Sequence, residues 1–194
     1  MDIVARAKGL LLQPETEWQA IAAEPADARS LFTGYAMILA AIPPIASLIG
    51  FSMLGAALGI GGMMGRLGFG WLLGHAIAQY VLGLAAVWVE SLIIAFLAPK
   101  FDGRADGTTA LKLAIYSPTA AWLAGIFAVI PFLGVLGILG LYSIYTLYVG
   151  LPILTGCPKD KTLIFLIAIV VAWLVLMVIF GSIAARVALF GGMM

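Results

Sequence analysis

The chain has 194 residues, of which 64% are hydrophobic and only 10% are charged, whereas soluble domains are about 45–50% apolar and about 25% charged. Its 10 basic and 9 acidic residues leave a net charge of +1, so no strong field attracts a polyanion. This composition excludes a soluble globular enzyme, a disordered tail and a nucleic-acid-binding protein. One cysteine and one histidine permit no intramolecular disulfide and leave little capacity for binding a metal.

Residues 1–30 lack the apolar core and cleavage site of a secretory signal and are expected to stay on the cytoplasmic side. Pro14 separates two short helices in this segment. The first combines apolar residues with Arg6 and Lys8 and is expected to lie along the membrane surface as an amphipathic helix. The second carries Trp18, which can anchor it at the interface. A simple tether and a docking site for a partner both remain open.

Four long stretches of the remaining chain are almost free of charge, with Glu90 as the one exception: 31–65, 67–99, 113–158 and 162–185. A bilayer core about 30 Å thick needs about 20 apolar residues in a helix. The third stretch, 46 residues long, would form a helix about 69 Å long, so it must fold back on itself. The break is expected at Pro131 and Gly134, because proline removes a backbone donor and glycine relaxes φ.

The sequence therefore predicts an all-α polytopic membrane protein, with a five-helix transmembrane domain over residues 31–190. The expected helices cover about 33–58, 71–97, 113–131, 135–155 and 163–186. A transmembrane β-barrel would need segments of about 10 residues that alternate apolar and polar side chains. The apolar runs of this chain are continuous, which favours helices.

Eight of the ten basic residues fall on one side of this arrangement, in the N-terminal segment and in the second–third and fourth–fifth loops. Arg66 and Arg186 fall on the other side. Because cytoplasmic loops carry the excess of Lys and Arg, the N-terminus is expected in the cytoplasm and the C-terminus outside.

Glu90 is the carboxylate within a predicted span, and His75 and Gln79 share its face of the second helix. An ionisable group in lipid is costly and marks a candidate site. One interpretation is a proton or ion path in which Glu90 is the acceptor and His75 the entry group. The other is a polar seam that holds helices together by hydrogen bonds.

The fourth predicted helix carries Tyr142 and Tyr145, whose hydroxyls could bond to Glu90, to Gln79 or to free backbone groups. Pro43 and Pro44 lie within the first predicted span and are expected to kink it. A binding site at that break and a kink that serves packing are the two alternatives.

No motif for catalysis, metal coordination or phosphate binding is present. Cys157, in a predicted cytoplasmic loop without a histidine beside it, is expected to be a spectator thiol. We therefore expect no catalytic residue, no metal and no cofactor.

Several short motifs together resemble the Yip family of Rab-interacting membrane proteins. They are Leu11-Leu-Gln-Pro-Glu-Thr-Glu-Trp18, Ala114-Ile-Tyr-Ser-Pro118, Ile130-Pro-Phe-Leu-Gly134, Leu141-Tyr-Ser-Ile-Tyr145, Tyr148-Val-Gly-Leu-Pro152 and Pro158-Lys-Asp-Lys161. The resemblance implies five helices with the N-terminus inside. The short N-terminal region resembles that of bacterial members, which implies a location in the bacterial cytoplasmic (inner) membrane.

Three function classes follow. The first is a non-enzymatic scaffold or adaptor that contacts membrane lipids and binds another membrane protein or a second copy of itself. The second is a small transporter or channel subunit that uses the face of His75, Gln79 and Glu90. The third, a membrane-embedded enzyme, has no nucleophile or metal to support it.

Overall fold

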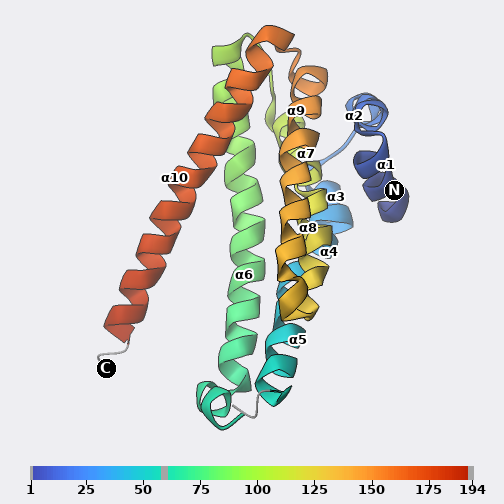
Figure 1. Cartoon of the computed structure of the whole chain (residues 1–194). Coiled ribbons are helices and arrows are strands. Elements are labelled where there is room, and N and C mark those ends of the chain that lie inside the picture. Colours follow the sequence, from blue (N-terminus) through green and yellow to red (C-terminus); the bar gives the residue numbers. More distant parts are fainter. Residues whose placement is uncertain (1, 58–60, 192–194) are drawn as a thin grey trace.

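The computed structural model describes the backbone of residues 2–57 and 61–191, with side chains described except at 54–69, 131, 177 and 179–191. Every element in these ranges is helical. Figure 1 shows long helices running side by side, with a hairpin of two short N-terminal helices on one flank of them. The all-α prediction is therefore confirmed for the described part of the chain.

The N-terminal hairpin consists of α1 (Ile3–Leu12) and α2 (Pro14–Ala23). The carboxylate of Asp2 caps α1 by accepting hydrogen bonds from the backbone N–H groups of Val4 at 2.9 Å and Ala5 at 3.1 Å. A proline at the first position of α2 suits a helix start, where its missing N–H costs no bond. Helices of only 10 residues are marginal in isolation, so packing must hold them.

The first apolar stretch forms a helix that begins earlier than predicted and is interrupted. Its parts are α3 (Ala28–Leu31), the π-helical turn η1 (Phe32–Ala36), α4 (Met37–Leu39) and α5 (Ile42–Ala57). The α-helix breaks at residues 40–41, and Pro43 and Pro44 then occupy the second and third positions of α5. Two prolines in succession remove two backbone donors, so the helix that ends before them restarts with a new set of hydrogen bonds.

The second stretch forms α6 (Gly61–Leu97), which starts ten residues before its predicted limit and is about 55 Å long at 1.5 Å per residue. It continues into the 3₁₀ turn η2 (Ala98–Phe101). Asp102 then adopts a left-handed conformation with φ 57°, which ends the helical path. Because α6 is longer than the hydrocarbon core of a bilayer, about 30 Å, it extends beyond the membrane or tilts within it.

The third stretch forms two antiparallel passes, as its length requires. The outward pass contains α7 (Gly107–Tyr116), α8 (Thr119–Ala124) and η3 (Gly125–Val129), and the return pass contains η4 (Pro131–Leu141) and α9 (Tyr142–Thr155). Asp106 caps α7 by accepting a hydrogen bond from the Thr109 N–H at 2.7 Å. The start of the outward pass therefore precedes the predicted residue 113.

The reversal between these passes occupies fewer residues than the predicted break at Pro131 and Gly134. Ile130 is extended, with φ −113° and ψ 106°, and Pro131 begins the returning 3₁₀ helix. A residue before proline is pushed out of the helical region, so Ile130 alone makes the break. Gly134, which the sequence analysis places in the turn, instead lies inside η4.

The last helix, α10 (Lys159–Gly191), packs against α6 and α9. The loops at this end of the bundle are tied together: the Arg104 N–H donates to the Thr155 carbonyl at 2.7 Å, and Lys161 forms an ion pair with Asp102. The two loops joined in this way are the ones that the sequence analysis places on the cytoplasmic side.

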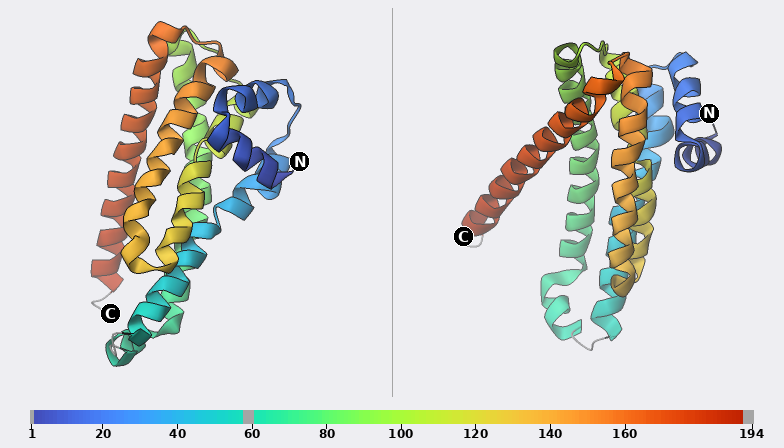
Figure 2. Two further views of the ribbon diagram at one scale, coloured as in Figure 1. Left: turned by 45° about the vertical axis from the view of Figure 1, so that its right-hand side comes forward. Right: turned by 45° about the horizontal axis from the view of Figure 1, so that its top comes forward.

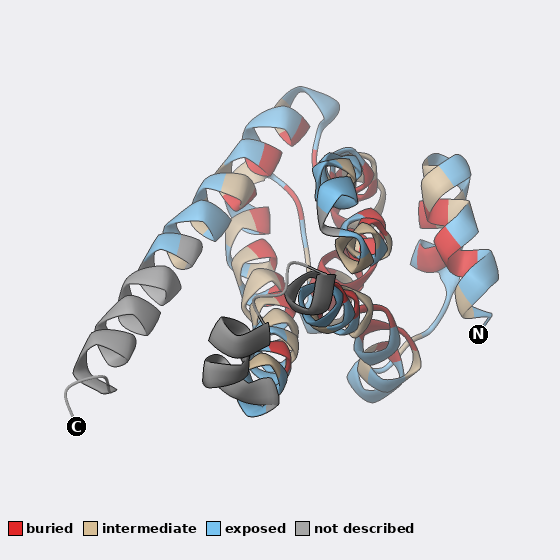
Figure 3. Cartoon of the chain, turned by 60° about the horizontal axis from the view of Figure 1, so that its bottom comes forward, coloured by how far each residue is buried: buried red, intermediate tan, exposed pale blue. Residues whose placement is uncertain are grey.

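Four candidate spans occur within the described residues: Ala28–Met53, Gly70–Phe101, Gly107–Val129 and Phe132–Thr155. The views in Figure 2 show α10 diverging from α6 toward its C-terminal end. Buried residues gather where the helices meet, while the outer faces of α6 and α10 carry many exposed residues (Figure 3). Exposed apolar side chains over these lengths are typical of surfaces that face lipid.

Candidate functional site

The N-terminal hairpin docks on the bundle through Trp18. Its ring is fully buried, and its indole Nε1 donates a hydrogen bond to the backbone carbonyl of Thr146 in α9 at 2.9 Å. A Cβ atom at Gly150 would lie 2.6 Å from Cε2 of Trp18, so the absence of a side chain there makes room for the indole. By its residue type Trp18 could anchor α2 at the membrane interface, but the structure buries it against α9 of the same chain.

An aromatic cluster extends from Trp18 into the bundle. The rings of Trp18 and Tyr116 meet edge to face with centroids 6.2 Å apart, and those of Tyr35 and Tyr116 do so at 4.8 Å. Thr119 Oγ1 donates to the Tyr116 carbonyl at 2.6 Å and lies 2.9 Å from the Tyr35 hydroxyl, which therefore donates to it. Each buried hydroxyl of Tyr35 and Thr119 is thus satisfied inside the chain.

Arg6 joins the two helices of the hairpin. Its guanidinium donates from Nη1 to Glu17 Oε1 at 2.6 Å and from Nη2 to Glu24 Oε1 at 2.6 Å, and it lies 5.7 Å from the centre of the Tyr116 ring. Burial by itself would lower the pKa of Arg6, but the hydrogen bond to Glu24 and the charges of Glu24 and Glu17 raise it. Arg6 therefore stays charged, and its two acidic partners offset the cost of burying that charge.

Lys112 ties the end of α2 to α7. Its ammonium is buried and donates to the backbone carbonyls of Ile21 at 2.7 Å and Glu24 at 2.6 Å. The last carbonyls of a helix have no partner within that helix, and a cation suits this position because of the helix dipole. Sequence reasoning counts Lys112 only as a positive loop residue, and no local signal identifies it as a cap.

The polar residues predicted in the second span lie apart from this junction. His75 and Gln79 are both exposed on α6, and the imidazole of His75 stacks on Trp71 with ring centroids 5.6 Å apart. Glu90 is half-buried, and no hydrogen bond or ion pair with another described residue involves its carboxylate. Neither His75 nor Gln79 has a hydrogen-bond partner among the described side chains either.

Tyr142, at the start of α9, belongs to the junction with the hairpin. The Tyr142 hydroxyl donates to the Leu11 carbonyl at 3.0 Å, and its ring lies 5.3 Å from that of Tyr145, which is 50% exposed. The sequence allows Tyr142 to bond to Glu90, to Gln79 or to a free backbone group. In the structure its hydroxyl bonds to a backbone carbonyl at the end of α1. Within the described residues, no hydrogen bond joins either tyrosine to Glu90.

The break at Pro43 and Pro44 is filled by packing. A Cβ atom at Gly125 in η3 would lie 2.6 Å from Cγ of Pro43, so Pro43 occupies the space beside that glycine. Across the residues that the structure describes, no group of three or more His, Cys, Asp and Glu side chains is placed to hold a metal ion.

Comparison with known proteins gives a match over most of the chain. A family profile described as "Yip1 domain" matches residues 8–183. Inner membrane protein YohC from two strains of Escherichia coli, K12 and O6:H1, is 30% identical over 127 residues, which is 64% of this chain and 64% of each relative. The aligned region thus spans just under two thirds of these relatives. No solved structure matches.

Proposed function

The chain belongs to the Yip1 domain family of multi-pass membrane proteins, and from this premise we propose that it is a non-enzymatic scaffold or adaptor. It binds another membrane protein or a second copy of itself through the outer face of α6. The observation that carries this proposal is the exposure of His75 and Gln79 in a candidate span. Yip family proteins are generally non-enzymatic, which agrees with the proposal.

The proposed topology has five spans in a bacterial cytoplasmic membrane, with α10 as the fifth. The N-terminus is in the cytoplasm and the C-terminus outside. Two observations support it: the excess of Lys and Arg on one side, and the ion pair of Lys161 with Asp102, which joins two loops of that side. An alkaline phosphatase fused after residue 191 should be active, and one fused after Lys161 inactive, whereas the reverse result would refute the orientation.

Polar side chains that face lipid lose hydrogen bonds with water and gain none in return. A helix from a partner protein would supply bonds to Gln79 and His75, which is a common way for polar residues to join helices. Gly70 and Gly74 lie on the same helix, and a Cβ atom at either would meet nothing within 4 Å. The backbone of α6 is therefore open to close approach beside these two side chains.

The test is photo-crosslinking in native membranes, with a photoreactive residue at Leu82, which is exposed one helical turn beyond Gln79. We expect a specific crosslinked product in the wild type and a large reduction in the double variant His75→Leu with Gln79→Leu. Ser52→Leu is the matched control, because the exposed Ser52 hydroxyl already bonds to its own helix, at the Leu48 carbonyl. An undiminished product in the double variant would refute the proposal.

A second candidate is a small transporter or channel subunit. The half-buried Glu90 carboxylate, without a hydrogen bond or ion pair to another described residue, favours it, since such a group within a span is a candidate for proton transfer. The exposure of His75 and Gln79 weighs against it, because a path along this face would run outside the single chain.

A further inference from the structure

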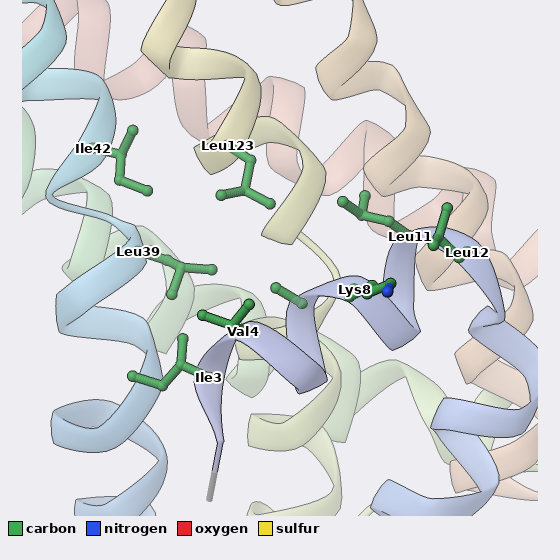
Figure 4. Close-up of a pocket in the computed structure, with 9 residues that line it drawn as sticks. Ile3, Val4, Lys8, Leu11, Leu12, Leu39, Ile42 and Leu123 are labelled. Carbon is green, nitrogen blue, oxygen red and sulfur yellow. The ribbon is translucent and has the colours of Figure 1, made fainter.

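An apolar groove of about 460 Å³ lies between the first N-terminal helix and the bundle. One wall comes from α1, and the opposite wall comes from α4, α5 and α8 (Figure 4). The residues that matter for its chemistry are Val4, Lys8, Leu12, Leu39, Ile42 and Leu123. Leu39 and Ile42 flank the break in the first span, so the interruption of that helix shapes one wall of the groove.

Lys8 is the one charged residue among the groove's described lining. It is exposed and has no hydrogen bond or ion pair with another described residue. Arg6, two positions earlier on the same helix, is by contrast bonded to two carboxylates. The hairpin therefore uses Arg6 for its own structure and leaves the Lys8 ammonium available to an outside anion.

The bundle walls of the groove lie within two candidate spans. Leu39 is the twelfth residue of Ala28–Met53, and Leu123 is the seventeenth of Gly107–Val129. The groove therefore opens toward the hydrocarbon region of the bilayer. The aliphatic stem of Lys8 lets its ammonium extend from this level toward the headgroups.

Apolar side chains on α1 remain uncovered at this level. Val4 is 75% exposed and Leu12 is 67% exposed, and both line the groove. A single flexible hydrocarbon chain suits a groove of this size, since its volume falls within the range of about 300–1,000 Å³ typical of small-molecule sites.

We propose that this groove holds one acyl chain of an anionic phospholipid from the leaflet on the N-terminal side, with the lipid phosphate at the Lys8 ammonium. The apolar walls provide the site for the hydrocarbon, and the Lys8 ammonium selects the charge of the headgroup. The site would make the docked α1 sensitive to the anionic lipid content of its membrane. It does not depend on the proposed partner surface, which lies on α6.

The test uses the full chain reconstituted in vesicles that contain equal amounts of phosphatidylglycerol and phosphatidylcholine, followed by extraction and native mass spectrometry. We expect one retained phosphatidylglycerol per chain. Lys8→Gln should reduce its retention about fivefold, the effect of a single basic residue at an anionic lipid surface. Lys8→Arg should preserve retention. Lys159→Gln, the matched control at an exposed lysine on α10, should also preserve it.

A second variant tests the hydrocarbon part of the site. Leu123→Trp places a larger side chain in the groove, and it should reduce retention of the lipid while the extracted protein keeps its helical circular dichroism. Equal retention of both lipids, no retained lipid, or equal losses in Lys8→Gln and Lys159→Gln would each overturn the proposal. A folded Leu123→Trp variant that retains phosphatidylglycerol like the wild type would also overturn it.

Discussion

The indole of Trp18 and the backbone carbonyl of Thr146 are joined by a 2.9 Å hydrogen bond across 128 positions of sequence. The bond connects α2 with the middle of α9, and the small Gly150 lets the indole approach the helix. Trp18, Tyr116 and Thr146 come from separate parts of the sequence and form one contact region. This region holds the N-terminal hairpin in place.

Gly150→Ala should release the hairpin. The new Cβ would lie 2.6 Å from Cε2 of the buried Trp18, and overpacking of this kind costs about 1–3 kcal/mol. We expect a lower unfolding temperature in mild detergent and faster proteolytic cleavage within residues 1–25. Gly134→Ala is the control, because a Cβ there would meet nothing within 4 Å. Equal protection of the hairpin in both variants would contradict the role of Gly150.

Lys112→Met should destabilise the same junction from the side of α7. The substitution keeps the length of the side chain but leaves the Ile21 and Glu24 carbonyls without their donor. An unsatisfied buried acceptor such as the Ile21 carbonyl costs about 1–3 kcal/mol, so the free energy of unfolding should fall by that amount. Thermal unfolding would measure it, with Lys159→Met at an exposed position as the control. A Lys112→Met variant as stable as the control would refute this assignment.

The approximate positions of the candidate spans were predictable, because a long run of residues without charge can be recognised in the local sequence. Stretches without charge, such as residues 31–65 and 113–158, are visible in the sequence, and the bilayer imposes their minimum length. Proline also acts locally, so the reversal near Pro131 could be placed to within a few residues. Gly134 was misplaced because glycine permits a turn without requiring one.

The junction of the hairpin could not be predicted, because its residues gain their roles from distant partners. Nothing near Gly150 in sequence indicates that an indole rests on it, and nothing near Lys112 indicates that it caps α2. The burial of Trp18 was missed for the same reason. Tryptophan suits both a membrane interface and a protein core, and only the position of α9 decides between them.

Asp106→Ala should make the stability of the bundle less dependent on pH. The hydrogen bonds from Thr109 lower the pKa of the Asp106 carboxyl below its ordinary value of 3.8. Its contribution is therefore complete above about pH 4 and is lost as the pH falls through the lowered pKa of the folded state. At neutral pH the loss of the cap should cost about 1 kcal/mol.

Asp106→Asn separates the charge of this residue from its hydrogen bonds. Asparagine also caps helices well, so this variant should retain most of the neutral-pH stability and lose part of its acid sensitivity. Unfolding curves between pH 2 and pH 7 (roughly the range spanned by carboxylate titration) would show both effects. If Asp106→Asn were as unstable at neutral pH as Asp106→Ala, charge rather than capping would be the main contribution.

Glu90→Gln distinguishes the two proposed functions. If the protein is a scaffold, vesicles containing the wild type should show only background proton flux, and Glu90→Gln should leave both that flux and the α6 crosslink unchanged. The reason is geometric: His75 and Gln79 are exposed on α6 rather than enclosed with Glu90 by the chain. Gln is nearly isosteric with Glu, so a change in flux would report the titratable group rather than a packing defect. A pH-dependent flux in the wild type that disappears in Glu90→Gln would establish the transporter instead and make Glu90 its proton acceptor.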